Sequence, residues 1–268
     1  MKPIIQILIL TLCLTSCKDS VKVTVTKEST PNIIKADTLT PSKILSKAEQ
    51  LINKTIKAHG GSLYDNASYT FIFRQKEYTF TNNGSDYRYE MKNETEADLI
   101  HDVLENDILT RIVNDKPIKL NEKQIKTYTG ALNSVIYFAT LPYKLNDATV
   151  NKAFKGTTSI KNEDYNIIEV TFNKEGGGQD HDDEFYFWIN TKTNTIDYLA
   201  YNYRVNGGGV RFRSAYNART VDGIRFQDYI NFKAPVNTLL KDLPKLYENG
   251  ELKELSRIET ENIINLNK

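Results

Sequence analysis

Alternating apolar and polar positions dominate two long stretches of the chain, residues 69–113 and residues 154–233. Successive side chains of a strand point to opposite faces of a sheet, so this period of two predicts β-strands. Short turns rich in Asn, Asp and Gly separate successive strands within each stretch, and connections so short favour antiparallel pairing. The expected strands cover 69–74, 77–81, 87–91, 98–103, 108–113, 154–161, 165–173, 184–190, 196–205, 210–217 and 224–233.

Before the first strand, apolar residues recur at helical spacing. We expect a helix that begins near Ser42, capped by Ser42 or Thr40, and ends at Gly60, because glycine tolerates the backbone conformation that follows a helix. His59 is the last residue before that glycine. A cation at this position would interact favourably with the helix dipole, so we expect His59 to be a structural cation.

A second helix is predicted over residues 122–139, with Asn121 as its cap and Gln124 as the partner in a capping box. Its apolar stripe is continuous, which predicts that it covers the open face of a sheet. Near the C-terminus we expect a short helix over residues 238–248 and one final edge strand over residues 252–266.

The N-terminus has the features of a secretion signal, because a lysine precedes an apolar run too short to span a membrane. The residues that end at Cys17 resemble the lipobox of bacterial lipoproteins. This resemblance implies a signal peptide over residues 1–16, a lipid on Cys17 and membrane attachment through that lipid. Lys18 favours the outer membrane by similarity to known sorting rules. We expect a flexible tether over residues 17–41 and a single domain over residues 42–268.

Composition removes several classes of function. The formal net charge is +1, so the chain lacks the basic excess of a nucleic-acid-binding protein. If Cys17 carries lipid and Cys13 leaves with the signal, no thiol remains for a disulfide, a zinc site or a cysteine nucleophile. The order of elements does not alternate between strands and helices, which argues against a Rossmann fold or a (β/α)₈ barrel. No phosphate-loop, G-x-S-x-G or H-E-x-x-H motif occurs.

An acidic loop follows the first triple glycine. Asp180, His181, Asp182 and Asp183 offer oxygen ligands and one imidazole, which suit a divalent cation such as calcium. The spacing matches no EF-hand. The alternatives are a catalytic acid–base pair and a solvated hairpin tip whose charges protect an edge strand.

Aromatic and arginine residues crowd the strands on either side of the second triple glycine, residues 207–209. One face of this hairpin should be core, and the other is unusually aromatic for a solvated surface, which leaves room for an apolar ligand. Arginines on neighbouring strands would hold an anionic headgroup, or would pair with Asp183 or Glu184 in a structural network. The candidate ligand-binding residues are Phe185, Phe187, Trp188, Tyr201, Tyr203, Arg204, Arg211 and Arg213.

The order of elements resembles the LolA/LolB class of lipoprotein carriers. The sequences of residues 175–190, 206–213 and 250–258 are similar to those of an uncharacterised lipoprotein family of Bacteroidota. These resemblances imply an α+β fold, mainly antiparallel β, with a curved sheet or incomplete barrel wrapping one or two helices. A deoxyribose-phosphate aldolase is unlike this sequence, because that enzyme is a cytoplasmic (β/α)₈ barrel.

Three functions remain open. The leading hypothesis is a non-enzymatic, lipid-anchored protein of the cell envelope that binds a lipid or another hydrophobic or amphipathic ligand in the concave face of its sheet. The second is a metal-assisted hydrolase centred on Asp180–Glu184. The third is a structural or partner-binding envelope lipoprotein. The sequence identifies no protein partner and no specific ligand.

Overall fold

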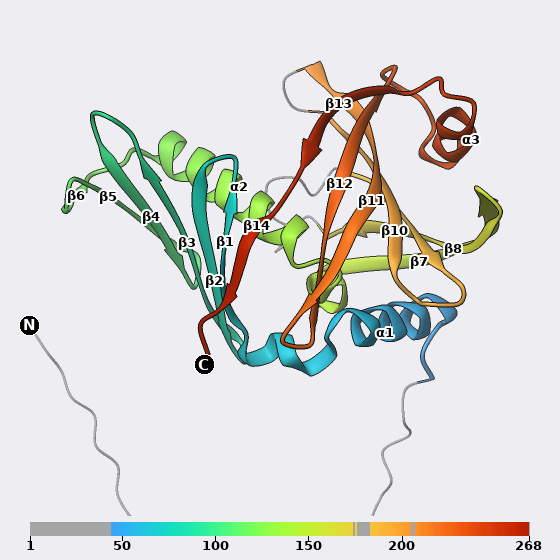
Figure 1. Ribbon diagram of the computed structural model, residues 1–268, viewed down its shortest axis with the longest axis horizontal. Coiled ribbons are helices and arrows are strands. Elements are labelled where there is room, and N and C mark those ends of the chain that lie inside the picture. Colours follow the sequence, from blue (N-terminus) through green and yellow to red (C-terminus); the bar gives the residue numbers. More distant parts are fainter. Residues whose placement is uncertain (1–43, 174, 176–182, 205–206, 268) are drawn as a thin grey trace, which may run out of the picture. The chain divides into compact units, whose positions relative to one another are not determined.

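The chain folds into two curved antiparallel sheets that do not close into a barrel (Figure 1). The computed structural model describes residues 44–173, 175, 183–204 and 207–267. Within them, the first sheet consists, in spatial order, of β14 (Glu261–Asn265), β1 (Ser68–Phe73), β2 (Lys76–Asn83), β3 (Asp86–Glu94), β4 (Leu99–Glu105), β5 (Ile108–Val113) and β6 (Lys116–Ile118). The second consists of β13 (Lys253–Ile258), β12 (Ile224–Ala234), β11 (Gly209–Val221), β10 (Ile196–Tyr203), β9 (Phe185–Asn190), β8 (Glu163–Phe172) and β7 (Val150–Ile160). The predicted fold class is confirmed.

The C-terminal segment passes from one sheet to the other, which corrects the prediction of a single edge strand over residues 252–266. β13 pairs with β12 in the second sheet, and β14 pairs with β1 in the first (Figure 1). A buried polar network fixes the crossing. Asp228 is 2% exposed and accepts hydrogen bonds from Arg219 at 3.1 Å and from the backbone N–H of Thr260 at 3.0 Å. These bonds hold Thr260 at the crossing and interrupt the strand.

The first helix, α1 (Lys47–His59), begins later than predicted. Its N-cap is Ser46, which forms a capping box with Glu49, and this local pair defines the helix start in place of Ser42. Ile44 precedes the helix and is 94% exposed. The 3₁₀ helix η1 (Gly61–Asn66) follows α1 directly.

His59 is neutral, contrary to the prediction of a cation. Its side chain is buried, and burial lowers its pKa to about 3, with a further contribution from the positive charge of Arg225. The Nε2 atom of His59 accepts a hydrogen bond of 3.2 Å from the backbone N–H of Ile196. His59 therefore links the end of α1 to the first residue of β10 as an acceptor.

The second helix, α2 (Glu122–Ala139), has the predicted bounds and the predicted capping box between Asn121 and Gln124. It lies on the first sheet (Figure 1), where Leu132 and Ile136 share a core cluster with aromatic residues of β1 and β2. The predicted role as a cover for a sheet is confirmed. The 3₁₀ helix η2 (Tyr143–Asn146) follows α2 and leads into β7.

The second sheet is covered on both faces. α1 packs on one face in a cluster that includes Leu51, Ile52 and Phe187. On the opposite face, η4 (Leu240–Asp242) and α3 (Leu243–Glu248) pack in a cluster that includes Trp188 and Phe212. Because successive side chains of β9 enter different clusters, all six residues of that strand are buried.

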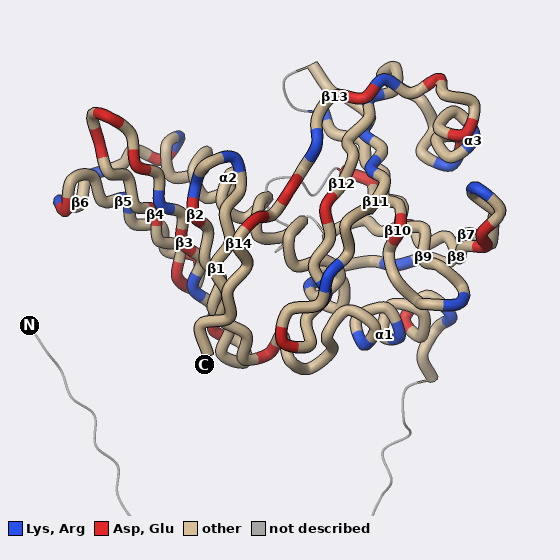
Figure 2. The backbone as a smooth tube through the Cα atoms, viewed as in Figure 1, with Lys and Arg blue, Asp and Glu red and all other residues tan. Residues whose placement is uncertain are grey.

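Residues 44–268 form one compact unit. Positively and negatively charged residues are both dispersed over the two sheets (Figure 2), in agreement with the net charge of +1. Among the described residues, no helix has the length and apolar character required to cross a membrane. The predicted signal peptide, the lipid on Cys17 and the tether lie outside the described residues.

Candidate functional site

Two adjoining cavities lie where α2, the first sheet and the second sheet meet. The larger is a groove of about 740 Å³, lined by residues of β3, α2, η2, β9, β10 and β11 among others. The smaller has a volume of about 310 Å³ and is lined mainly by the end of β1, by α2 and by strands β10 to β13. Ser134, Phe138, Tyr201 and Arg213 line both cavities, so the two share a wall at these side chains.

The wall of the groove is aromatic. The register of β9 with β10 places Phe185 opposite Tyr201, and the two rings stack with their centres 5.2 Å apart. Phe138 of α2 lies 5.5 Å from Tyr201, and Phe172 of β8 lies 5.7 Å from Phe185. Tyr87 and Tyr89 line the groove from the first sheet. The arrangement forms an apolar wall with hydroxyl groups at intervals.

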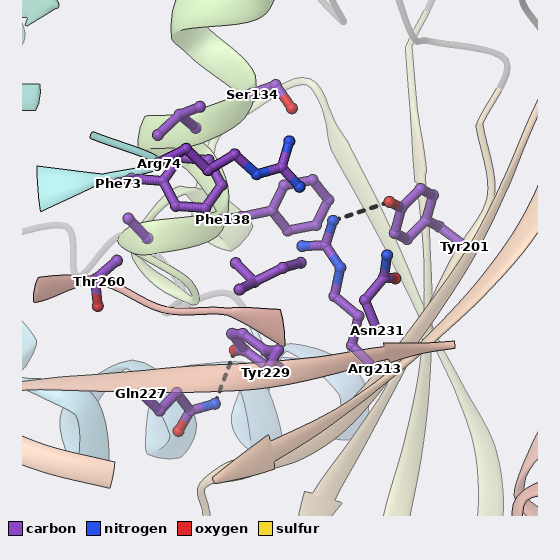
Figure 3. A pocket seen from close by; sticks show the side chains of 13 residues that line it. Phe73, Arg74, Ser134, Phe138, Tyr201, Arg213, Gln227, Tyr229, Asn231 and Thr260 are labelled. Carbon is purple, nitrogen blue, oxygen red and sulfur yellow. Dashed lines mark hydrogen bonds between the residues drawn. The ribbon is translucent and has the colours of Figure 1, made fainter. Parts of the chain in front are cut away.

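Arg213 carries a buried charge at the wall that the two cavities share (Figure 3). Its Nη2 donates to the Tyr201 hydroxyl at 2.9 Å, and its guanidinium lies 3.9 Å from the centre of the Phe138 ring. The residue is only 7% exposed, yet its Nε and Nη1 have no hydrogen-bond partner. Within the described part of the chain, Arg213 pairs with no carboxylate. Arginine stays protonated in proteins, so the charge remains unneutralised in the cavity wall.

Tyr203 and Arg211 line the groove, and Gly209 lies next to Tyr203. Arg211 donates to the Tyr203 hydroxyl and lies over the Tyr203 ring, 5.0 Å from its centre. Tyr203 lies opposite Gly209 in the register of β10 with β11, and its ring occupies the space that a side chain at Gly209 would fill. A Cβ on Gly209 would lie 2.5 Å from the Tyr203 hydroxyl oxygen. Glycine at this position therefore lets Tyr203 reach Arg211.

The structure separates the eight predicted ligand-binding residues into two groups. Five line the larger groove, and the other three do not line either cavity. Phe187 is buried in the core beneath α1, Trp188 is buried on the opposite face of the sheet, and Arg204 is exposed just beyond β10. The five that line the groove are Phe185, Tyr201, Tyr203, Arg211 and Arg213. Their role in binding stays a prediction.

The acidic loop is only partly described. Asp180, His181 and Asp182 lie outside the described residues, while Asp183 lines the larger groove. The residues that the structure does describe include no group of three or more potential metal-ligating side chains. Calcium or another divalent cation at this loop therefore stays a prediction.

The alternative prediction was that the arginines pair with Asp183 or Glu184 in a structural network. Among the described residues, neither Arg211 nor Arg213 forms such a salt bridge. Both guanidiniums donate to tyrosine hydroxyls instead. Glu184 exchanges hydrogen bonds with Asn202, and burial raises the pKa of its carboxyl. Among the described residues, neither of these two arginines therefore has an acidic partner.

Several residues that line the cavities were not predicted from the sequence. Tyr137 and Phe138 lie outside the apolar stripe that predicted the packing of α2. Two aromatic residues beside that stripe indicate that a second face of the helix also contacts an apolar environment. Arg74 occupies the β1–β2 turn with a positive φ of 49°. Such a conformation favours Gly or Asn, so the arginine at this position gave the sequence no signal of a turn.

The chain belongs to a family of unknown function, DUF6503, whose model matches residues 38–260. No curated protein matches the chain. Among solved structures, the chain is similar to a LolA superfamily protein from Nitrosomonas europaea, with 11% identity, a TM-score of 0.47, and coverage of 82% of this chain and 93% of that one. A DUF1329 family protein from Desulfovibrio piger has 11% identity, the same two coverages and a TM-score of 0.41. Lipoprotein LppX from Mycobacterium tuberculosis has 11% identity, a TM-score of 0.27, and coverage of 59% and 88%.

Proposed function

We propose that the protein binds a hydrophobic or amphipathic ligand, such as a lipid, in the groove between its two sheets. The observation that carries this proposal is a groove of about 740 Å³ with a stacked aromatic wall and a buried arginine that has no carboxylate partner among the described residues. This volume is within the range of small-molecule sites, which are mainly apolar with a few placed polar groups. An aromatic wall of this kind favours hydrocarbon, because burial of apolar surface is the main driving force for such binding.

We further propose that the protein acts at the cell envelope, anchored by a lipid on Cys17 in the outer membrane. This part rests on the sequence of residues 1–18 alone. A lipid anchor would hold the groove near a bilayer, which is the source of amphipathic ligands. The proposed role is that of a carrier or sensor and involves no chemical step.

A neutral apolar dye, N-phenylnaphthylamine, tests binding in the groove. The full chain carrying Cys17→Ser, which has no lipid of its own, is titrated with the dye, and the dye's fluorescence is recorded. The variant Ser134→Trp adds a large side chain at an exposed position that lines both cavities. We expect the dye to bind the parent and to bind Ser134→Trp at least tenfold more weakly.

The matched control is Thr127→Trp, which adds the same side chain at an exposed position of α2 that lines neither cavity. It should bind the dye as the parent does. Equal binding to all three proteins would place the dye outside the groove and count against the proposal, as would no binding at all.

A further inference from the structure

The smaller cavity differs from the larger groove in charge. Charged residues of both signs line the larger groove, namely Asp107, Lys144, Asp147, Asp183, Arg211 and Arg213. The smaller cavity is lined by two arginines, Arg74 and Arg213, and no acidic residue is among the described residues that line it. It therefore carries a positive charge that nothing in its own wall balances.

The two arginines come from different sheets. Arg213 lies on β11 of the second sheet, and Arg74 lies in the turn that follows β1 of the first sheet. In Figure 3, the guanidinium of Arg74 points toward Phe138 and Arg213. Within the described chain Arg74 has no acidic partner, and its guanidinium is placed 5.0 Å from the centre of the Phe73 ring. Both cations are thus available at one cavity.

Arg213 has two donors that lack a partner. Its Nε and Nη1 have no hydrogen-bond partner among the described residues. Figure 3 shows Arg213, Asn231 and Tyr201 around one region of the pocket. A buried donor without a partner is costly unless a ligand supplies an acceptor, and anionic oxygen is the acceptor that forms the strongest bonds with guanidinium.

We propose that the smaller cavity binds the anionic group of an amphipathic ligand, a carboxylate or a phosphate, between Arg213 and Arg74. This proposal rests on the function proposed above and adds the ligand's chemical class. The apolar chain of the same ligand lies along the larger groove, because Ser134, Phe138, Tyr201 and Arg213 border both cavities. An anion held by one arginine from each sheet would also link the two sheets.

The experiment compares oleate with oleyl alcohol, which share a chain and differ in charge. Each is titrated into the full chain carrying Cys17→Ser, and its affinity is measured by displacement of N-phenylnaphthylamine. We expect oleate to bind at least tenfold more tightly than oleyl alcohol. The preference should disappear in Arg213→Met and decrease at least threefold in Arg74→Ala.

Arg88→Ala is the matched control, because Arg88 lies on β3 but lines neither cavity and pairs with Glu90 and Glu105. It should keep the preference for oleate. Equal affinities for oleate and oleyl alcohol in the parent would overturn the anion site and leave the apolar groove intact. The same conclusion follows if Arg213→Met retains the preference.

Inorganic phosphate, titrated by calorimetry, separates a lipid headgroup from a free anion. In one outcome, phosphate binds the parent, binds Arg213→Met at least tenfold more weakly, and neither oleate nor oleyl alcohol binds. This outcome would support the anion site and contradict the function proposed above. If none of the three probes binds, both proposals are overturned.

Discussion

The guanidinium of Arg213 lies 3.9 Å from the centre of the Phe138 ring and joins α2, which covers the first sheet, to β11 of the second sheet. A cation over an aromatic face is attracted to the ring, and the attraction is stronger away from water. The contact offsets part of the cost of burying Arg213 but supplies no hydrogen-bond acceptor. The unliganded protein therefore retains a buried group whose hydrogen bonds are incomplete.

Arg213→Met should stabilise the unliganded protein. Methionine keeps a flexible apolar side chain against Phe138 and removes two donors that have no partner among the described residues. We expect the free energy of unfolding to rise by roughly 1–3 kcal/mol, the cost of a buried unsatisfied group. Urea denaturation monitored through Trp188, the one tryptophan of the chain, measures it. Arg88→Met should change stability by less than about 0.5 kcal/mol. A loss of stability in Arg213→Met would mean that the arginine is structural.

Gly209→Ala should be destabilising because of Tyr203. The new methyl group would meet the Tyr203 hydroxyl oxygen at 2.5 Å, so the ring has to move and its hydrogen bond with Arg211 is lost. We expect a cost of about 1–3 kcal/mol, typical of overpacking. In a Tyr203→Ala background the same change should cost at least 1 kcal/mol less, as a double-mutant cycle of unfolding free energies would measure. Equal costs in both backgrounds would show that the two residues do not interact.

The buried His59 predicts a pH dependence of stability. Its pKa is about 3 in the folded protein and 6.5 for an unperturbed histidine, so below pH 6.5 the unfolded chain binds a proton that the folded protein excludes. The contribution is fully present above pH 6.5 and is lost as the pH falls toward 3, at about 1.4 kcal/mol per pH unit.

His59→Gln isolates this contribution, because glutamine retains an acceptor for the Ile196 N–H and does not titrate. Between about pH 7.5 and pH 5.5, the parent should lose roughly 1.4 kcal/mol more of its unfolding free energy than the variant loses. Few carboxylates titrate in this interval. Parallel curves for the two proteins would contradict a buried neutral histidine.

Arg219→Met should weaken the crossing between the sheets. It leaves the Asp228 carboxylate, 2% exposed, without its cation, which typically costs about 3–5 kcal/mol. Arg257→Met removes an exposed pair with Glu254 and should cost less than about 1 kcal/mol. Hydrogen exchange should show faster exchange of the β14 amides in Arg219→Met than in Arg257→Met. Unchanged exchange in β14 would argue against a role for Asp228 in holding that strand.

Elements set by local pattern were predictable from the sequence, and those set by distant contacts were not. The capping box joins Asn121 and Gln124, which are three residues apart, and the alternation of a strand likewise involves only neighbouring residues. The crossing at Thr260 depends on Arg219 and Asp228, and these contacts span 41 and 32 residues. His59 is neutral because it is buried, and its position as the last residue of α1 does not reveal that burial.

The candidate site was predictable in part for the same reason. Alternation along β11 places Arg211 and Arg213 on the face opposite Phe212, which predicts a shared environment. Alternation along β9 likewise places Trp188 on the face opposite Phe185. Arg74 reaches the smaller cavity only because β1 belongs to the other sheet, and the sequence does not reveal how two sheets approach each other.

Native mass spectrometry of the full chain carrying Cys17→Ser tests the central claim most directly. The protein is purified from the cells that produce it without denaturant, beside its Ser134→Trp variant. The account predicts extra non-covalent mass in the lipid range on the parent, lost on denaturation and at least tenfold less abundant on Ser134→Trp. A bare polypeptide mass for the parent, or equal extra mass on both proteins, would contradict ligand binding in the groove.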